Sequence, residues 1–390
     1  MIYFDNSATT KPSEASLSAM REALCTSFGN PSSVHFAGGA ARRLMEQARE
    51  SIASSLGIRG PFQGRVFFTS GGTEANNLAI LGGAAAKSHP EKNGSRGKII
   101  ITDGEHSSVE NPARQLESQG FTLVRIPTVS GKLDLETLET AADSTTVLCA
   151  FMLVNNETGA LYDIKSAAAI VRKKAPKALI HCDAVQAYMK TKLLPTVLGV
   201  DTLSVSSHKI FAPKGAGALY VKNDVTVAKR LVPTVFGGGQ EEGMRSGTEN
   251  VPAIVAFGAA AKEGAALMQA RIMAVENVRS AIISCLPENV RVNIPDSFLA
   301  NIINITLPGI KSETMLNYLS GEGICVSAGS ACSTHAPGRV SRALTAFGLA
   351  PEEADCSLRL SLSHENTVEE AKIFCKVLAD GINRLARIRR

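Results

Sequence analysis

Several patterns that mark a specialised class of protein are missing from this sequence. Its 8 cysteines, spread over 390 residues, include no pair at two-residue spacing, so the sequence predicts neither a disulfide scaffold nor a zinc ribbon. No stretch approaches the roughly 18 uninterrupted apolar residues of a membrane span, and the N-terminus lacks the basic and apolar regions of a signal peptide. We therefore expect a cytoplasmic protein with no membrane partner, whose cysteines are mostly reduced.

An excess of charge of one sign is also lacking. Lys and Arg total 41 against 36 Asp and Glu, a net charge of +5, and the one basic cluster is Arg384, Arg387, Arg389 and Arg390. Without a basic stripe we expect no nucleic-acid partner. With 44% hydrophobic and 20% charged residues the composition is that of an ordinary folded protein. A chain of this length predicts one large domain and a smaller one.

Short apolar runs alternate with longer amphipathic ones between residues 65 and 220. The amphipathic runs predict helices at 74–87, 109–119 and 164–174, and the apolar runs predict strands at 66–68, 99–101, 123–126, 147–151, 178–181, 202–205 and 217–220. Strands that alternate with helices imply crossover units, hence a mainly parallel sheet covered on both faces. The expected fold is a doubly wound α/β domain.

The pattern changes after the glycine-rich segment 236–240. A long alanine-rich helix is predicted at about 252–285, with Pro252 in its first turn, where proline is tolerated. Strand and helix signals follow at 301–306, 313–319, 323–326, 357–362 and 368–386. We expect a large α/β domain over 15–255 and a small α+β domain formed by 1–14 and 256–390.

Three motifs carry chemistry. In 68–77 a strand ends in small residues and opens a helix, so its N–H groups and the Thr73 hydroxyl suit a phosphate, although Thr73 could also be an ordinary N-cap. In 204–215 a strand end presents hydroxyls, an imidazole and Lys209, as a pyridoxal phosphate Schiff base requires, although most single lysines are solvated. Asp183 ends a third strand, where it could bind a pyridinium nitrogen or cap a helix. A P-loop and a dinucleotide fingerprint are both missing, which disfavours a nicotinamide dehydrogenase.

Further segments of the chain belong with these motifs. They are Tyr3-Phe4-Asp5-Asn6-Ser7-Ala8-Thr9-Thr10, Gly29-Asn30-Pro31-Ser32-Ser33-Val34-His35, Gly71-Gly72-Thr73-Glu74-Ala75-Asn76-Asn77, Asn155-Asn156-Glu157-Thr158-Gly159, Arg245-Ser246-Gly247-Thr248, Ser327-Ala328-Gly329-Ser330-Ala331-Cys332 and Ser357-Leu358-Arg359-Leu360-Ser361. Together they resemble the pyridoxal-phosphate-dependent cysteine desulfurases of the class V aminotransferase group, in the branch of the iron–sulfur-cluster and nitrogen-fixation enzymes. The resemblance runs over almost the whole chain and implies fold type I, L-cysteine as substrate and a homodimer.

The resemblance also implies a role for individual residues. Lys209 would form the Schiff base, His106 would stack on the pyridine ring, and Cys332 would be the nucleophile. Other positions would contact the cofactor or substrate: Asp183 the ring nitrogen, Gln186 the phenolic oxygen, Gly72 the cofactor, Thr73, Ser206 and His208 the phosphate, Thr248 the phosphate from the second subunit, and Asn156 and Arg359 the substrate. Outside this context His106 is more often a loop histidine, and Arg359 half of a salt bridge.

The segment around Cys332 is composed of small and polar residues, which is typical of a mobile loop, whereas Cys149 and Cys182 lie in apolar strands. His335 follows three residues later, but two candidate ligands without a second pair do not make a zinc site, so we expect no metal. In the lysine motif Ser207 and Ala212 replace glycines of the family, which puts in doubt how tightly the backbone approaches the cofactor.

The implied activity is the conversion of L-cysteine to L-alanine, with a persulfide left on Cys332 for an acceptor such as an iron–sulfur scaffold. A selenocysteine lyase or a small-amino-acid aminotransferase of the same fold would not need Cys332. A non-catalytic scaffold is a further alternative, but it has no physical reason to keep Lys209, Asp183, His106 and Arg359 together.

Overall fold

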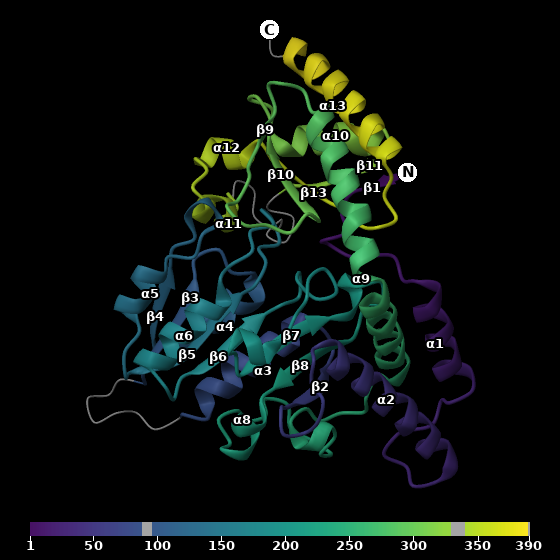
Figure 1. Cartoon of the computed structure of the whole chain (residues 1–390), viewed down its shortest axis with the longest axis vertical. Coiled ribbons are helices and arrows are strands. Elements are labelled where there is room, and N and C mark those ends of the chain that lie inside the picture. Colours follow the sequence, from purple (N-terminus) through teal and green to yellow (C-terminus); the bar gives the residue numbers. More distant parts are fainter. Residues whose placement is uncertain (88–95, 329–339, 389–390) are drawn as a thin grey trace.

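The computed structural model describes residues 1–87, 96–328 and 340–388, with side chains up to 385. Its larger part is built on a seven-stranded sheet of order β2-β8-β7-β6-β5-β3-β4 (Figure 1). The strands are β2 (Arg65–Thr69), β3 (Lys98–Thr102), β4 (Thr122–Ile126), β5 (Thr146–Met152), β6 (Leu179–Asp183), β7 (Thr202–Ser206) and β8 (Gly217–Val221). Neighbours from β7 to β4 are parallel, and β8 runs antiparallel to β7 and β2. The predicted doubly wound sheet is confirmed.

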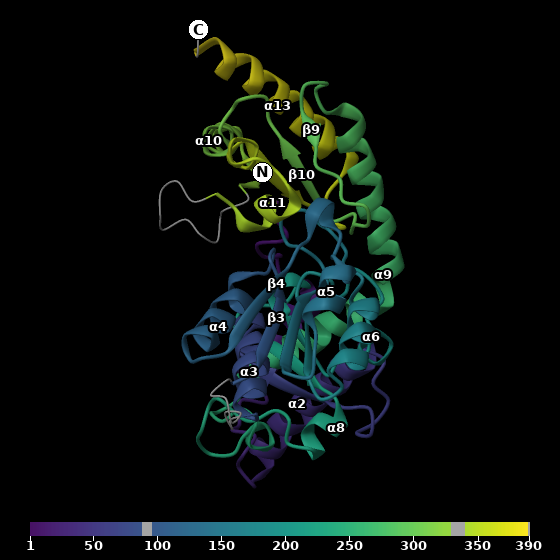
Figure 2. The same ribbon diagram turned by 90° about the vertical axis from the view of Figure 1, so that its left-hand side faces the viewer.

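Successive strand residues enter different apolar clusters on the two faces of this sheet. In β3, Ile99 and Ile101 join the cluster that contains residues of α3 (Gly72–Ala85) and α4 (Ser107–Ser118). Ile100 joins the cluster that contains residues of α5 (Leu135–Ala141), α6 (Ile164–Lys174) and α9 (Val251–Cys285). Figure 2 shows α3 and α4 on one side of the sheet and α6 and α9 on the other. Because both faces are covered, the strands read as continuous apolar runs.

Helix α9 links the two parts of the chain. It begins at the N-cap Asn250, whose side chain accepts from the backbone N–H of Ala253, and it packs against α1 (Glu14–Cys25) and α2 (Phe36–Ser55). Among the described residues only α9 is long and apolar enough to cross a membrane, and 56% of its most apolar stretch is buried inside the protein. That burial is what a core helix requires.

A second, smaller sheet of order β12-β13-β10-β9 lies above the first in Figure 1. Its elements, with the helices beside it, are β9 (Arg291–Val292), β10 (Ile302–Thr306), β12 (Ser327–Ala328), β13 (Ser357–Ser361), α10 (Ser312–Gly321), α11 (Arg342–Phe347), α12 (Pro351–Asp355) and α13 (Val368–Ile388). The N-terminal β1 (Ile2–Tyr3) pairs in parallel with β11 (Ile324–Cys325). Ile2 and Phe4 share an apolar cluster with the second half of α9 and with α13. The division of the chain at 14/15 and 255/256 stays a prediction.

Shorter elements complete the described chain. They are α7 (Pro195–Leu198), α8 (Asn223–Val227) and the 3₁₀ turns η1 (Val129–Gly131), η2 (Ser207–Lys209) and η3 (Glu241–Gly243). Cys149 and Cys182 are buried in strands, as predicted. Cys285 and Cys375 form a disulfide between α9 and α13. No local sequence pattern predicts this bond, since its partners are 90 residues apart.

Candidate functional site

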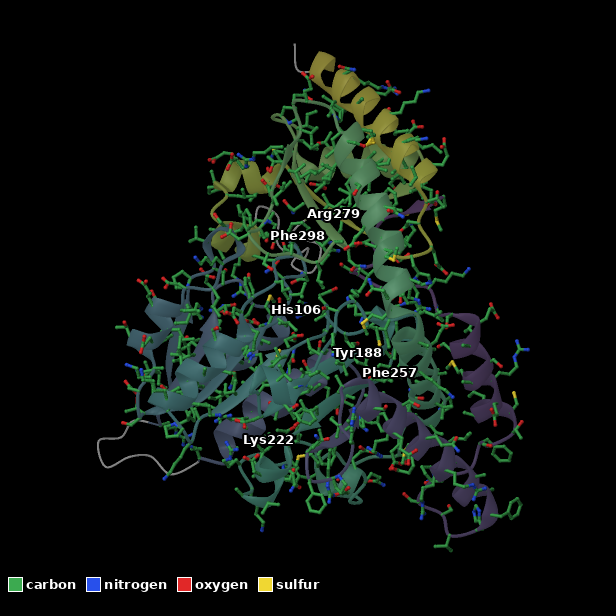
Figure 3. All side chains as sticks on the ribbon, in the orientation of Figure 1. His106, Tyr188, Lys222, Phe257, Arg279 and Phe298 are labelled. Atoms are coloured by element: carbon green, nitrogen blue, oxygen red, sulfur yellow. A yellow bond between two sulfur atoms is a disulfide. The ribbon has the colours of Figure 1, made fainter. Side chains whose placement is uncertain are left out.

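The candidate site lies where the carboxyl ends of the parallel strands meet the small sheet. Asp183 and Ser206 are the last residues of β6 and β7, and Lys209 ends the turn η2 that follows β7. His106 follows β3 and caps α4. Figure 3 shows His106 between the two sheets, below Arg279 and Phe298 of the smaller part. Open α/β sheets bind their ligands at this edge.

A cavity of about 300 Å³ opens at this edge. All but two of the predicted site residues line it: Gly72, Thr73, His106, Asn156, Asp183, Gln186, Ser206, His208, Lys209 and Arg359. Thr248 is exposed and is not part of the lining. Cys332 lies outside the described residues. The structure therefore brings ten predicted residues from six segments of the chain to one place.

At one end of the cavity, hydrogen-bond donors have no acceptor within the described part of the chain. Helix α3 starts here, and its N-cap Gly71 has no side chain to satisfy the first N–H groups. A Cβ on Gly72 would lie 2.6 Å from Cγ2 of Val185, so any side chain would close this end. The Ser206 hydroxyl is buried and has no hydrogen-bond partner among the described residues. Burial, with Lys209 and Lys214 nearby, lowers the pKa of His208 to about 4.

The N-terminal segment lines the cavity beside Lys209. Nζ of Lys209 donates to the backbone carbonyls of Ser7 at 2.5 Å and Ala8 at 2.8 Å. Nε2 of Gln186 donates to the same Ser7 carbonyl at 3.0 Å, and Oε1 of Gln186 accepts from Nζ of Lys190 at 3.1 Å. In the sequence this segment stands out only through its resemblance to the family. A carbonyl contact carries no side-chain signal, so the residue types alone could not reveal it.

Asp183 and His106 receive their hydrogen bonds from neighbouring elements. Oδ2 of Asp183 accepts from Nδ2 of Asn76 at 2.7 Å, and Oδ1 accepts from the backbone N–H of Val185 at 3.0 Å. Nδ1 of His106 accepts from the backbone N–H of Ser108 at 3.1 Å. Burial lowers the pKa of His106, although the nearby carboxylate of Asp183 opposes this effect. The imidazole is therefore neutral at neutral pH.

Arg359 is the cationic group on the small-sheet side. Its side chain is 7% exposed; NH2 lies 2.8 Å from Oδ1 of Asp5, and NH1 donates to the backbone carbonyl of Asn156 at 3.0 Å. Nε is buried without a partner among the described residues. Asp5 was not predicted, since it is 354 residues away from Arg359 along the chain.

Ser207 and Ala212, which replace glycines of the family in the lysine motif, lie in and just after the turn η2 that follows β7. The Ser207 hydroxyl lies 2.7 Å from the backbone carbonyl of Ala216 and 2.5 Å from that of Pro213. Ala212 is buried. The hydroxyl thus stabilises the loop that follows Lys209 instead of lining the cavity.

The comparison with known proteins identifies the family. A family model described as "Aminotransferase class-V" matches residues 2–374. The chain belongs to this family. Among class V aminotransferases, it is 38% identical to cysteine desulfurase IscS 1 of Archaeoglobus fulgidus, over 99% of this chain and 98% of that one. It is 35% identical to cysteine desulfurase IscS of Methanosarcina thermophila, over 98% and 92% of the two chains.

Solved structures agree with this assignment. A NifS-like protein superposes with a TM-score of 0.88 at 34% identity, over 99% of both chains. SspA in complex with cysteine superposes with a TM-score of 0.80 at 32% identity, over 94% of this chain and all of that one. Within the class V aminotransferases, the chain is thus a member of the cysteine desulfurase group.

A buried glutamate, Glu105, and a partly buried one, Glu157, border the site of this class V aminotransferase. Oε1 of Glu105 accepts from Oγ1 of Thr102 at 2.7 Å and from the backbone N–H of Met152 at 2.8 Å, while Oε2 has no partner among the described residues. Burial raises the pKa of Glu105 to about 8. Burial also raises the pKa of Glu157 to about 7, and Oε2 of Glu157 accepts from the Ser341 hydroxyl at 2.6 Å.

Replacing Glu105 should change how stability depends on pH. The unfolded carboxyl titrates near its ordinary pKa of 4.5, so between that pH and about 8 the folded state holds a proton that the unfolded state has lost. The free energy of unfolding therefore falls as pH rises through this window. Glu105→Gln keeps the oxygen that accepts from Thr102 and removes the titration. Urea unfolding across the window should show this variant gaining stability relative to the parent protein as pH rises.

Glu117→Gln, at an exposed position on α4, controls for the loss of one negative charge. A difference between Glu105→Gln and the parent that does not change with pH would contradict the assignment of a buried protonated carboxyl.

Proposed function

We propose that the chain converts L-cysteine to L-alanine and leaves a persulfide on Cys332, from which a sulfur acceptor such as an iron–sulfur scaffold takes the sulfur. One observation supports this function most strongly: the predicted residues line a single cavity. They do so in a chain that is 38% identical to a cysteine desulfurase over 99% of its length. SspA, a structural relative, was solved in complex with cysteine, which supports L-cysteine as the substrate proposed for this chain. We place the reaction in the cytoplasm.

Pyridoxal 5′-phosphate fits the residues present in the cavity. The unpartnered Ser206 hydroxyl, the first N–H groups of α3, Thr73 and His208 would hold its phosphate. Asp183 would bind the ring nitrogen, and Gln186 the phenolic oxygen. When bound, the cofactor supplies an electron sink that stabilises negative charge at the substrate's Cα.

The residues of the chain supply binding and proton transfer. Lys209 would hold the cofactor covalently and then, displaced by the substrate amine, move the proton at the substrate's Cα. The carboxylate of Asp183 would keep the ring nitrogen protonated. His106, neutral because burial lowers its pKa, would cover the ring face.

Arg359 would bind the substrate carboxylate, with Asn156 beside it. Asp5 and the Asn156 carbonyl hold two of its nitrogens, and Nε is the buried donor that still needs an acceptor. A guanidinium suits this role because its planar donors match the two oxygens of a carboxylate.

Removing the guanidinium should therefore impair the use of L-cysteine without loss of the cofactor. Arg359→Ala should lower kcat/KM by roughly a hundredfold, the cost of a charge-assisted hydrogen-bonded contact. Arg359→Lys should recover only part of the loss, because an ammonium lacks the planar fork. Steady-state kinetics and cofactor absorbance measure the two effects. Arg291→Ala, which alters an exposed arginine of the small sheet, is the control. An unchanged kcat/KM for Arg359→Ala would show that Arg359 does not bind the substrate.

Cys332 would act as the nucleophile toward sulfur. Its thiolate attacks the substrate's sulfur, a sulfur–sulfur bond forms, and the bond between that sulfur and Cβ breaks. The electron pair of the broken bond stays with the carbon fragment, which takes up protons and leaves as alanine. The parent thiol is thereby converted to a persulfide with no external oxidant.

Cys332→Ser should bind cofactor and L-cysteine normally but form no alanine. Cys25→Ser, which alters an exposed cysteine at the end of α1, should keep full activity. Alanine is quantified by amino-acid analysis, and the extra sulfur is located by mass spectrometry after a cysteine pulse. Sulfide release by Cys332→Ser at the parent rate, or extra sulfur on another residue, would favour a lyase that does not use this thiol.

The proposal includes a homodimer in which Thr248 completes the partner's phosphate site. In a single chain Thr248 is exposed and does not line the cavity. Segments 31–49 and 241–249 line a common surface groove. Near this groove along the chain lie exposed apolar side chains that a partner could cover: Phe28, Val34, Phe36 and Phe236.

Two inactive variants should therefore complement each other. Lys209→Ala and Thr248→Glu, co-expressed with different tags, should form hybrid dimers with one intact site, because Lys209 of one chain meets Thr248 of the other. The hybrid is purified through both tags and assayed for alanine formation. Lys209→Ala paired with Asp183→Ala, two residues of one cavity, should stay inactive. A purified Lys209→Ala/Thr248→Glu hybrid without activity would refute the shared site.

A further inference from the structure

Asn76, a fully buried residue of α3, makes four side-chain hydrogen bonds beneath the cavity. Nδ2 donates to Oδ2 of Asp183 at 2.7 Å and to the Ser108 hydroxyl at 2.8 Å. Oδ1 accepts from Nε2 of His181 at 2.9 Å and from the Ser204 hydroxyl at 2.5 Å. These bonds use both donors and both lone pairs of the amide, the full capacity of an asparagine side chain.

The direction of this amide is fixed by its partners. In the opposite orientation Oδ1 would face the Asp183 carboxylate, and two acceptors would lie 2.7 Å apart in a buried site, which costs free energy. With Oδ1 toward His181 instead, Nε2 of that histidine must carry a hydrogen. Nδ1 of His181 then accepts from the Thr202 hydroxyl at 2.9 Å. Burial lowers the pKa of His181 to about 3, so this ring is neutral and has the single N–H that the arrangement needs.

The same amide acts on His106 through Ser108. Because the Ser108 hydroxyl accepts from Asn76, its own hydrogen is available to Nδ1 of His106, 2.8 Å away. The backbone N–H of Ser108 also points at Nδ1, at 3.1 Å. Two donors on Nδ1 leave Nε2 as the nitrogen that carries the hydrogen in a neutral ring.

We propose that Asn76 is a positioning residue that fixes two groups of the reaction at once, Asp183 as a carboxylate that accepts on both oxygens and His106 as its Nε2–H tautomer. Neither role follows from the family resemblance, which assigns nothing to Asn76. The part that concerns Asp183 and the cofactor rests on the proposed function. The tautomer of His106 does not, because it is a property of the protein alone.

The charged groups around His106 act on its protonation from three other elements. Asp183 at the end of β6 raises the pKa of the ring, whereas Lys209 of η2 and Arg342 of α11 lower it, as burial does. A change at Asn76 leaves these charges in place. It alters which nitrogen carries the hydrogen and how Asp183 is held, and an aspartate at position 76 also adds a carboxyl group beside Asp183.

The first test measures the tautomer directly in the full-length protein, with and without added pyridoxal 5′-phosphate. The chain has 7 histidines, so ¹⁵N-histidine labelling gives a spectrum in which His106→Gln identifies one ring. The parent should show a protonated Nε2 and an unprotonated Nδ1 at His106. Ser108→Ala should raise the population of the Nδ1–H form while cofactor affinity, measured by equilibrium dialysis, stays at the parent value.

The second test replaces the amide itself. Asn76→Asp is isosteric but removes both N–H donors, so it should disturb the His106 tautomer and weaken cofactor binding by roughly tenfold to hundredfold, the cost of a hydrogen bond to a charged group. Its pH profile for kcat should also shift relative to the parent. Asn77→Asp makes the same amide-to-carboxyl replacement at the next residue of α3. Asn77 lies outside the hydrogen bonds of Asn76, since its Nδ2 donates to the Thr73 carbonyl. That control should match the parent in tautomer, affinity and pH profile.

The outcomes separate the inference from the proposed function. A parent His106 with its hydrogen on Nδ1, or an Asn76→Asp protein with unchanged tautomer and cofactor affinity, would overturn the role of Asn76. Should Asn76→Asp fail to fold, Ser108→Ala still tests the link between Asn76 and His106. Ser204→Ala removes one donor to Oδ1 of Asn76 and leaves both N–H groups of the amide in place, so it should weaken cofactor binding less than the loss of those N–H groups would. A protein with the expected tautomer but without alanine formation would refute the proposed function alone.

Discussion

The candidate site depends on one constraint: charged groups are wholly or partly removed from water and must find partners inside the protein. The Asp183 carboxylate accepts from an asparagine amide and a backbone N–H, Lys209 donates to two backbone carbonyls, and Arg359 pairs with Asp5. A buried charge without such partners costs several kcal/mol. The cavity is therefore lined by groups whose positions are already determined before a ligand enters.

The partners come from both sheets and from the N-terminal segment, which explains why the site lies between the two parts of the chain. Asp183 and Ser206 belong to the large sheet and Arg359 to the small one, while Ser7 provides the carbonyl shared by Lys209 and Gln186. Any shift of the small sheet relative to the large one would break the contact of Arg359 with the Asn156 carbonyl. The geometry of substrate binding and the packing of the two parts are thus coupled.

Most of the large sheet could be predicted from the sequence because it depends on local patterns, whereas most of the candidate site residues were predicted from the family resemblance. Apolar runs such as 99–101 predict strands, and polar residues at their ends, such as Asp183, predict ligand contacts. What could not be predicted depends on distant pairs. Asp5 and Arg359 meet across 354 residues, and the hydrogen bonds of Asn76 use a residue that reads as ordinary helix surface. Periodicity carries no signal for such contacts. Thr248 lies apart from the cavity in one chain, so its role depends on a second chain that no local pattern describes.

The N-terminal strand has a consequence for how the protein is made. Ile2 and Phe4 donate their backbone N–H groups to the carbonyls of Gly323 and Cys325, and Ser361 donates to the carbonyl of Phe4. Residues 2 and 4 therefore have their backbone partners in segments that are synthesised much later, at 323–325 and 361. The large sheet has all its strands by residue 221 and is able to fold while synthesis continues. The cavity acquires its N-terminal wall only after residue 361 has been synthesised, so a shorter nascent chain has an incomplete site.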